Sequence, residues 1–105
     1  MKKINIVFSI FLCIFTLSCE SVIKEKLTKM SYRGVVTEIY RDPENHYAYT
    51  FSIRTSQNEF STHADFYPKS WEWAEIGDSI IKEQGQLSVT IKKKDGECGV
   101  FYYQY

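Results

Sequence analysis

The chain has 105 residues, of which 44% are hydrophobic and 25% charged, and its 13 basic residues equal its 13 acidic ones. This composition is typical of a folded globular chain and argues against a disordered one. Without Lys2 and Lys3 the remainder has 11 basic and 13 acidic residues, a balance that argues against a nucleic-acid-binding surface. The length allows one small domain, so we expect no cofactor-binding fold and no cofactor.

The N-terminal segment has the pattern of a secretory signal. Met1-Lys2-Lys3 forms a short basic head, and residues 4–17 are almost entirely apolar. A membrane-spanning helix needs about 20 apolar residues, and Glu20 ends this run too early. We therefore expect residues 1–18 to form a signal peptide that is removed on export.

The apolar stretch ends in Thr16-Leu17-Ser18-Cys19, which resembles the lipobox of bacterial lipoproteins. In that family a small residue precedes a cysteine that is lipidated and becomes the new N-terminus. Ser18 and Cys19 match these two positions, whereas Thr16 stands where the family prefers leucine. The resemblance implies that lipid on Cys19 anchors the protein to a membrane, facing the periplasm or the cell surface. Without lipidation, a disulfide between Cys19 and Cys98 is the alternative.

Residues 19–30 contain three lysines, two glutamates and scattered apolar residues. The segment shows no strand alternation. Its apolar residues could share one helix face, but the segment is too short for a stable isolated helix, and we interpret it as a tether. These apolar residues are Val22, Ile23, Leu27 and Met30.

Apolar and polar residues begin to alternate with a period of two after residue 30, which predicts β-strands. We therefore expect residues 31–105 to form one β domain. Pro43 favours a turn, and Pro68 suits the first turn of a short helix over residues 68–75, where the alternation stops. The expected strands cover residues 32–40, 46–55, 59–66, 79–82, 86–93 and 98–103.

A two-residue turn at Gln57-Asn58 would place Ser52 opposite His63, with Asp65 further along the same face. These residues could act as nucleophile, base and orienting acid, so a small hydrolase is one alternative. They lie on flat strands, and no glycine-rich turn or helix N-terminus is placed to form an oxyanion hole. We therefore expect the protein not to be an enzyme. The sequence has no metal-ligand spacing motif either, so no metal site is expected.

Asp95-Gly96 is the strongest short hairpin signal in the chain. A two-residue turn there pairs Ile91 with Val100 and places Cys98 on the core face of the last strand. Aromatic residues on the other face of this strand would then be exposed on a rigid hairpin, where they could anchor a partner. The residues predicted to bind in this way are Phe101, Tyr103 and Tyr105.

Three strands, a short helix and two or three further strands resemble the OB-fold, a small barrel with its helix between strands three and four. We therefore expect a mostly β fold, a five- or six-stranded antiparallel barrel, with an SH3-like barrel as the alternative. The lipobox, together with Trp71 or Trp73 followed by Gly77-Asp78-Ser79-Ile80, makes the layout similar to small lipoproteins of Bacteroidota. That resemblance implies no particular chemistry.

These expectations lead to a non-enzymatic binding module that a lipid holds in the bacterial envelope and that contacts a protein or a glycan. Tyrosine-rich surfaces suit such contacts, because a rigid ring buries a large area at low entropic cost. The alternative is an inhibitor or immunity-type lipoprotein that blocks an enzyme in the envelope. Nucleic acid is not expected as a partner, and the oligomeric state is left open.

Overall fold

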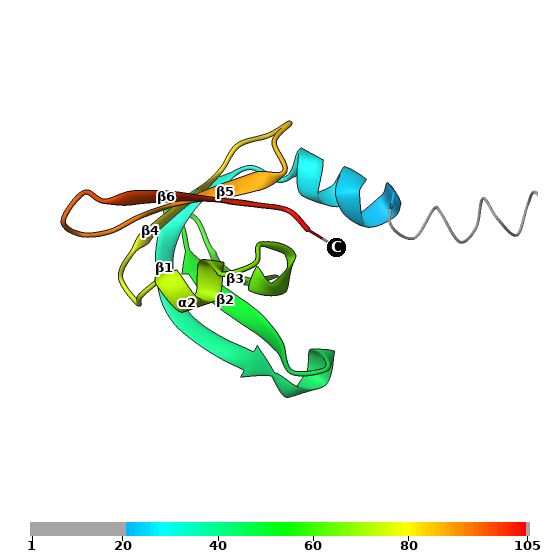
Figure 1. Cartoon of the computed structure of the whole chain (residues 1–105), viewed down its shortest axis with the longest axis horizontal. Helices are drawn as coiled ribbons and strands as arrows, with labels where there is room; N and C mark the ends of the chain where they lie inside the picture. Colours follow the sequence, from blue (N-terminus) through cyan, green and yellow to red (C-terminus); the bar gives the residue numbers. More distant parts are fainter. Residues whose placement is uncertain (1–20, 105) are drawn as a thin grey trace, which may run out of the picture.

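Six strands form one antiparallel sheet in the computed structural model, which describes residues 21–104 (Figure 1). Their spatial order is β3-β2-β1-β4-β5-β6, so the predicted mostly β class is confirmed. The predicted signal peptide, Cys19 and Tyr105 lie outside the described residues. The strands are β1 (Tyr32–Asp42), β2 (Ala48–Arg54), β3 (Glu59–His63), β4 (Ser79–Lys82), β5 (Ser88–Lys92) and β6 (Cys98–Tyr102).

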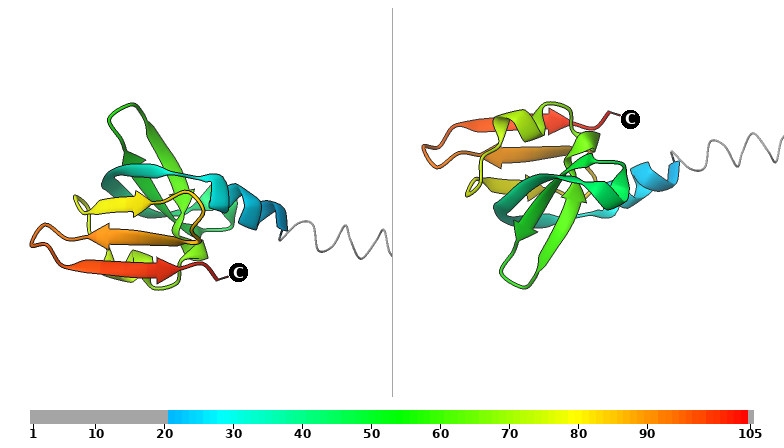
Figure 2. Two further views of the ribbon diagram at one scale, coloured as in Figure 1. Left: turned by 90° about the horizontal axis from the view of Figure 1, so that it is seen from above. Right: turned by 90° about the horizontal axis from the view of Figure 1, so that it is seen from below.

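β1 joins the two halves of the sheet, because its first residues pair with β4 and its later residues pair with β2. A bulge between Val36 and Glu38 shifts the register with β2, and bulges bend a strand. The sheet consequently curls around the core (Figure 2). Gly34 permits the close approach of β2, since a Cβ atom there would lie 2.6 Å from Ile53 and 2.7 Å from the carbonyl oxygen of Arg54.

The edge strands β3 and β6 do not pair with each other, so the sheet is open where the sequence predicts a barrel. The cause is that β3 ends at His63, after which the chain turns into the 3-10 helix η2 (Ala64–Phe66). The edges approach beyond the strands, where the N–H of Gln104 donates to the carbonyl of Phe66 at 2.9 Å. The rings of Phe66 and Tyr103 lie 5.9 Å apart at the same place.

The core lies on the concave side of the sheet, where η2 and α2 (Ser70–Trp73) pack against it. α2 confirms the predicted short helix, and its two tryptophans reach different halves of the sheet. Trp71 stacks on Tyr49 of β2 at 4.8 Å between ring centroids. Trp73 contacts Phe101 of β6 at 5.7 Å. The buried apolar residues of this core are Val36, Phe51, Ile53, Ala64, Tyr67, Ala74, Ile80, Val89 and Ile91.

The segment before β1, which the sequence analysis interprets as a tether, is helical over residues 21–29. The helix is not isolated, because Leu27 is buried against the domain. The carbonyl of Thr28 accepts a hydrogen bond from the N–H of Gly85 at 2.7 Å, and the Met30 carbonyl accepts one from Lys82 Nζ at 3.2 Å. Tertiary contacts thus supply the stability that so short a helix lacks alone.

β2 and β3 pair two residues away from the predicted register, so that Ser52 lies opposite Ser61 and His63 opposite Thr50. The turn has four residues in place of two, because the Thr55 hydroxyl accepts hydrogen bonds from two backbone N–H groups inside the turn. A shift of two residues keeps every side chain on its predicted face. The separation of apolar and polar faces on these strands is therefore as predicted.

β5 and β6 pair one residue away from the predicted register, with Thr90 opposite Val100. A two-residue type I′ turn requires a positive φ at both central residues, and in this turn only Gly96 has one, at 96°. A three-residue turn forms instead and is closed by the N–H of Lys93, which donates to the carbonyl of Glu97 at 2.7 Å.

This shift of one residue reverses the two faces of β6. Phe101 and Tyr103, which the sequence predicts to face outward, pack against the core. Cys98, predicted on the core face, is an exposed free thiol, and Tyr102 is 69% exposed. The prediction that Phe101 and Tyr103 are exposed, on which their binding role depends, is therefore wrong. Tyr105 lies outside the described residues.

Two double variants test the register of β6. Phe101→Ser with Tyr103→Ser removes two rings from the core and should lower the free energy of unfolding by at least about 3 kcal/mol. Val100→Ser with Tyr102→Ser, the matched exposed pair, should change it by less than about 1 kcal/mol. Chemical denaturation followed by circular dichroism measures both. The opposite ranking, or a Cys98 thiol that reacts slowly in the native protein, would contradict this register.

Candidate functional site

The structure does not bring together the predicted catalytic candidates. Ser52 lies opposite Ser61, two positions from its predicted place beside His63. Asp65 is exposed in η2, and the His63 ring lies 5.9 Å from the ring of Phe66. No hydrogen bond joins these three candidates in the described part of the chain, so they do not form the arrangement that nucleophilic catalysis requires.

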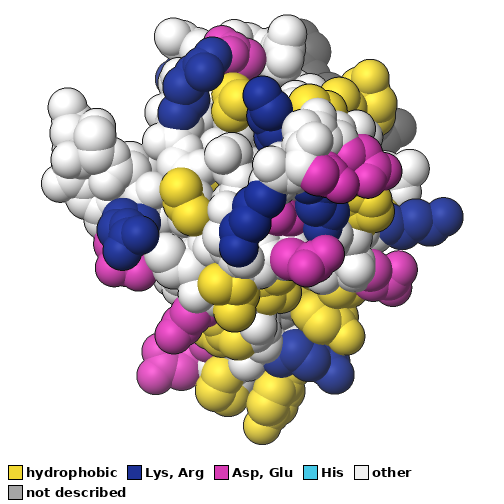
Figure 3. Space-filling model, turned by 90° about the vertical axis from the view of Figure 1, so that its left-hand side faces the viewer, with side chains coloured by type: hydrophobic (Ala, Val, Ile, Leu, Met, Phe, Trp, Pro, Cys, Tyr) yellow, Lys and Arg dark blue, Asp and Glu magenta, His cyan; other side chains and the backbone are white. Residues whose placement is uncertain are grey.

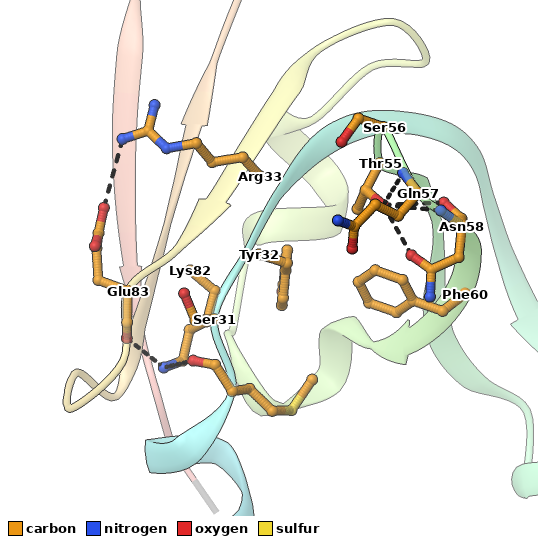
Figure 4. Close-up of a pocket in the computed structure, with 11 residues that line it drawn as sticks. Ser31, Tyr32, Arg33, Thr55, Ser56, Gln57, Asn58, Phe60, Lys82 and Glu83 are labelled. Atoms are coloured by element: carbon orange, nitrogen blue, oxygen red, sulfur yellow. Dashed lines mark hydrogen bonds and ion pairs between the residues drawn. The ribbon is translucent and has the colours of Figure 1, made fainter.

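A cleft opens where the ends of β1 and β4 face the turn between β2 and β3 (Figure 4). Its volume is about 600 Å³, which is within the size range of small-molecule sites. The curvature of β1 brings these segments together, although they are far apart in the sequence. The cleft is therefore the candidate site.

One side of the cleft carries charged groups. Arg33 and Glu83 contact each other at 3.7 Å, and their side chains are 76% and 56% exposed, so this is a loose surface pair. Lys82 is only 1% exposed. Its Nζ donates to the backbone carbonyls of Glu83 at 2.7 Å and of Met30 at 3.2 Å. Burial lowers the pKa of the Lys82 ammonium, and the negative charge of Glu83 opposes this effect.

The opposite side of the cleft is the β2–β3 turn, which Thr55 holds in place. The Thr55 hydroxyl donates to Asn58 Oδ1 at 2.8 Å and accepts from the backbone N–H groups of Gln57 and Asn58 at 3.2 and 3.1 Å. Asn58 Nδ2 and the side-chain amide of Gln57 then have no partner among residues 21–104. The Gln57 side chain extends across the cleft towards Tyr32 (Figure 4), so hydrogen-bonding groups on a fixed turn face the open space.

Two aromatic rings lie between these sides. Tyr32 and Phe60 meet edge to face, with ring centroids 5.1 Å apart and an angle of 74° between planes. Burial, followed by the charge of the nearby Tyr67 phenol, raises the pKa of Tyr32 well above its ordinary value. Burial and Tyr103 likewise raise the pKa of Tyr67 to about 12. A phenol is already neutral at physiological pH, and these shifts extend that neutrality to more alkaline pH.

A second charged cluster surrounds Lys93, at the other end of β4. Lys93 Nζ lies 3.0 Å from Asp78 Oδ2 and 3.2 Å from Glu75 Oε1, donates to the Trp73 carbonyl, and lies 4.5 Å from the centroid of the Trp73 ring. Burial alone would lower the pKa of Lys93, but hydrogen bonds to Asp78 and Glu75 raise it above its ordinary value. Every charge in the cluster has a partner, so we assign it a structural role. Basic and acidic side chains are interspersed on this face of the molecule (Figure 3).

None of the cleft residues is among the candidates that the sequence suggests. Gln57-Asn58 stands out in the sequence only as a turn. One signal was present in Ser79–Lys82, where the strand period of two places Lys82 on the same face as buried Ile80. A lysine on a core face requires polar partners at that end of the strand, and these partners lie beside the cleft.

Comparisons with protein-family models, curated protein sequences and solved structures found no match for this chain. Within residues 21–104, no helix is long and apolar enough to cross a membrane. In the same residues no group of three His, Cys, Asp or Glu side chains is placed to hold a metal ion. The function must therefore be argued from the cleft itself.

Neighbouring lysines on β5 and its turn test the structural role of the charged cluster. Lys93→Met leaves the carboxylate of Asp78 buried without its cation and should lower the free energy of unfolding by about 3–5 kcal/mol. Lys92→Met, the exposed control, should change it by less than about 0.5 kcal/mol. Equilibrium denaturation of the two variants measures the difference, and equal stabilities would show that the ion pair does not hold this turn.

Proposed function

We propose that this protein is a non-enzymatic binding module, held at a bacterial envelope membrane by a lipid on Cys19, and that its cleft binds a saccharide. The observation that carries this proposal is that the exposed Gln57 side-chain amide and Asn58 Nδ2, which have no partner among residues 21–104, line the same cleft as the rings of Tyr32 and Phe60. Amide groups donate to and accept from sugar hydroxyls, while the apolar faces of sugar rings pack on aromatic side chains.

The lining of the cleft favours binding over catalysis. Hydrolysis of a glycosidic bond generally uses two carboxylates on either side of the bond. Among residues 21–104, the cleft is lined by one carboxylate, Glu83, which contacts Arg33. The same described lining includes no histidine or cysteine, the side chains that most often act as base or nucleophile.

We also infer that the curled sheet is of the OB type. Its order β3-β2-β1-β4-β5, with α2 before β4, is that of an OB barrel left open at one seam and extended by β6. OB-folds bind oligosaccharides and oligonucleotides through their loops and one sheet face. This assignment supports a binding role, and the lining of the cleft indicates which class of ligand is bound.

An inhibitor or immunity-type role is the second candidate, favoured by the tip of the β1–β2 hairpin. His46 and Tyr47 both have positive φ, at 56° and 58°, and Tyr47 is 58% exposed. Such strained backbone is frequent at functional sites. An exposed aromatic ring on a projecting hairpin (Figure 1) could enter the active site of an enzyme.

The anchor is tested by metabolic labelling with a tagged fatty acid in a bacterial host. The wild-type chain should incorporate the label, and Cys19→Ser should not, because the lipobox resemblance assigns the acyl group to this cysteine. Cys98→Ser is the matched control and should label like the wild type. Label on Cys19→Ser, or no label on the wild type, would contradict the anchor.

Saccharide binding is tested by titrating the full-length chain with a panel of soluble oligosaccharides. Gln57→Ala should weaken binding about 2- to 10-fold, which corresponds to the loss of one or two neutral hydrogen bonds. Gln86→Ala, an exposed glutamine outside the cleft, should bind like the wild type. The inhibitor role replaces this proposal if two results are obtained together. No saccharide binds, and the wild-type chain co-purifies with a single enzyme that the Tyr47→Ser variant no longer retains.

A further inference from the structure

We propose that the ligand of the cleft is an amphiphile, a saccharide with an apolar tail, and that the tail lies in a groove beside the cleft. This inference rests on the proposed function and names the class of ligand. The groove has a volume of about 410 Å³ and lies between the helix of residues 21–29 and β3. Its apolar lining includes Ile23, Leu27 and Phe66, and its polar lining consists of Lys26, Ser61, Thr62 and His63.

The groove continues the cleft. Met30 lines both spaces. The two also follow each other along one face of β3, because Phe60 lines the cleft and Thr62, two residues further on the same face, lines the groove. A ligand that fills the cleft therefore meets the groove as the adjoining space, and an apolar extension of that ligand is the occupant that this continuity favours.

Met30 is the residue that lines both spaces. Its backbone is fixed, since its N–H donates to the Leu27 carbonyl at 3.2 Å and its carbonyl accepts from Lys82 Nζ at 3.2 Å. The Met30 side chain is half-buried, and methionine is unbranched with several rotatable bonds. A change of rotamer can therefore join the cleft and the groove without any movement of the helix or the sheet.

The two spaces differ in chemistry in the way that the two ends of an amphiphile differ. The cleft presents the Gln57 side-chain amide and Asn58 Nδ2, which have no partner among residues 21–104. The groove presents Leu27, which is 5% exposed, together with the half-buried Ile23. The exposed lining of the groove is more apolar than polar, so an alkyl chain there would leave water favourably, whereas a second sugar ring would regain only part of the hydrogen bonds that it makes to water.

Methyl β-glucoside and octyl β-glucoside share a head group and differ only in the tail. We expect the full-length chain, kept soluble by an amphipathic polymer, to bind the octyl compound at least 10-fold more tightly below its micelle concentration. The reason is that each methylene removed from water strengthens binding several-fold. Isothermal titration calorimetry measures both affinities.

Ile23→Ser should abolish most of this difference while leaving the affinity for methyl β-glucoside unchanged. Val22→Ser, a neighbour that is 59% exposed and does not line the groove, is the matched control and should keep the difference. Equal affinities for the two glycosides, or binding of neither, would overturn the inference. The oligosaccharide panel would then still test the proposed function separately. If octanol binds as tightly as octyl β-glucoside, the head group contributes nothing, and both proposals are wrong.

Discussion

Asp78 holds together three parts of the chain that are distant in sequence. Its backbone carbonyl accepts a hydrogen bond at 2.9 Å from the N–H of Val36, at the bulge where β1 bends. Its side chain accepts one from the N–H of Glu75 at 2.8 Å, after α2, and lies 3.0 Å from Lys93 Nζ, in the β5–β6 turn. The bend in β1 makes the sheet curl, and the curl makes both the core and the cleft. Asp78, which is 2% exposed, therefore joins the bend of β1 through its backbone and the α2 and β5–β6 segments through its carboxylate, in a domain whose described residues contain no disulfide.

The strand period predicted the elements well. It predicts the face of each side chain correctly only when any error in the pairing register is an even number of residues. On β2 and β3 the predicted register was two residues off, and Phe51 and Ile53 still lie in the core. On β6 it was one residue off, and every face was reversed. Asp95-Gly96 is compatible with a two-residue turn and with a three-residue turn. The choice between them depends on which residues β6 packs against. Gly99 shows this contact, because a Cβ atom there would lie 3.1 Å from the Trp73 ring.

The cleft could not be predicted in the same way, because its residues become neighbours only after the sheet curls. The helix of residues 21–29 was missed for a related reason, since its stability comes from Leu27 and from contacts with the loop after β4. Local propensity is silent about such contacts. The position of Lys82 on an inward face was the one local sign of a polar site at this end of the sheet.

The cleft and the groove are built from the ends of strands, whereas the core is built from their middles. Gln57, Asn58 and Ile23 can therefore change without removing a core contact, and ligand preference can vary separately from stability. Lys82 and Tyr32 are among the exceptions, because they pair with each other across β1 and β4 and belong to both the fold and the cleft. Lys82 also binds the carbonyl at which the helix meets β1. The contact that fixes the helix therefore lies in the lining of the cleft.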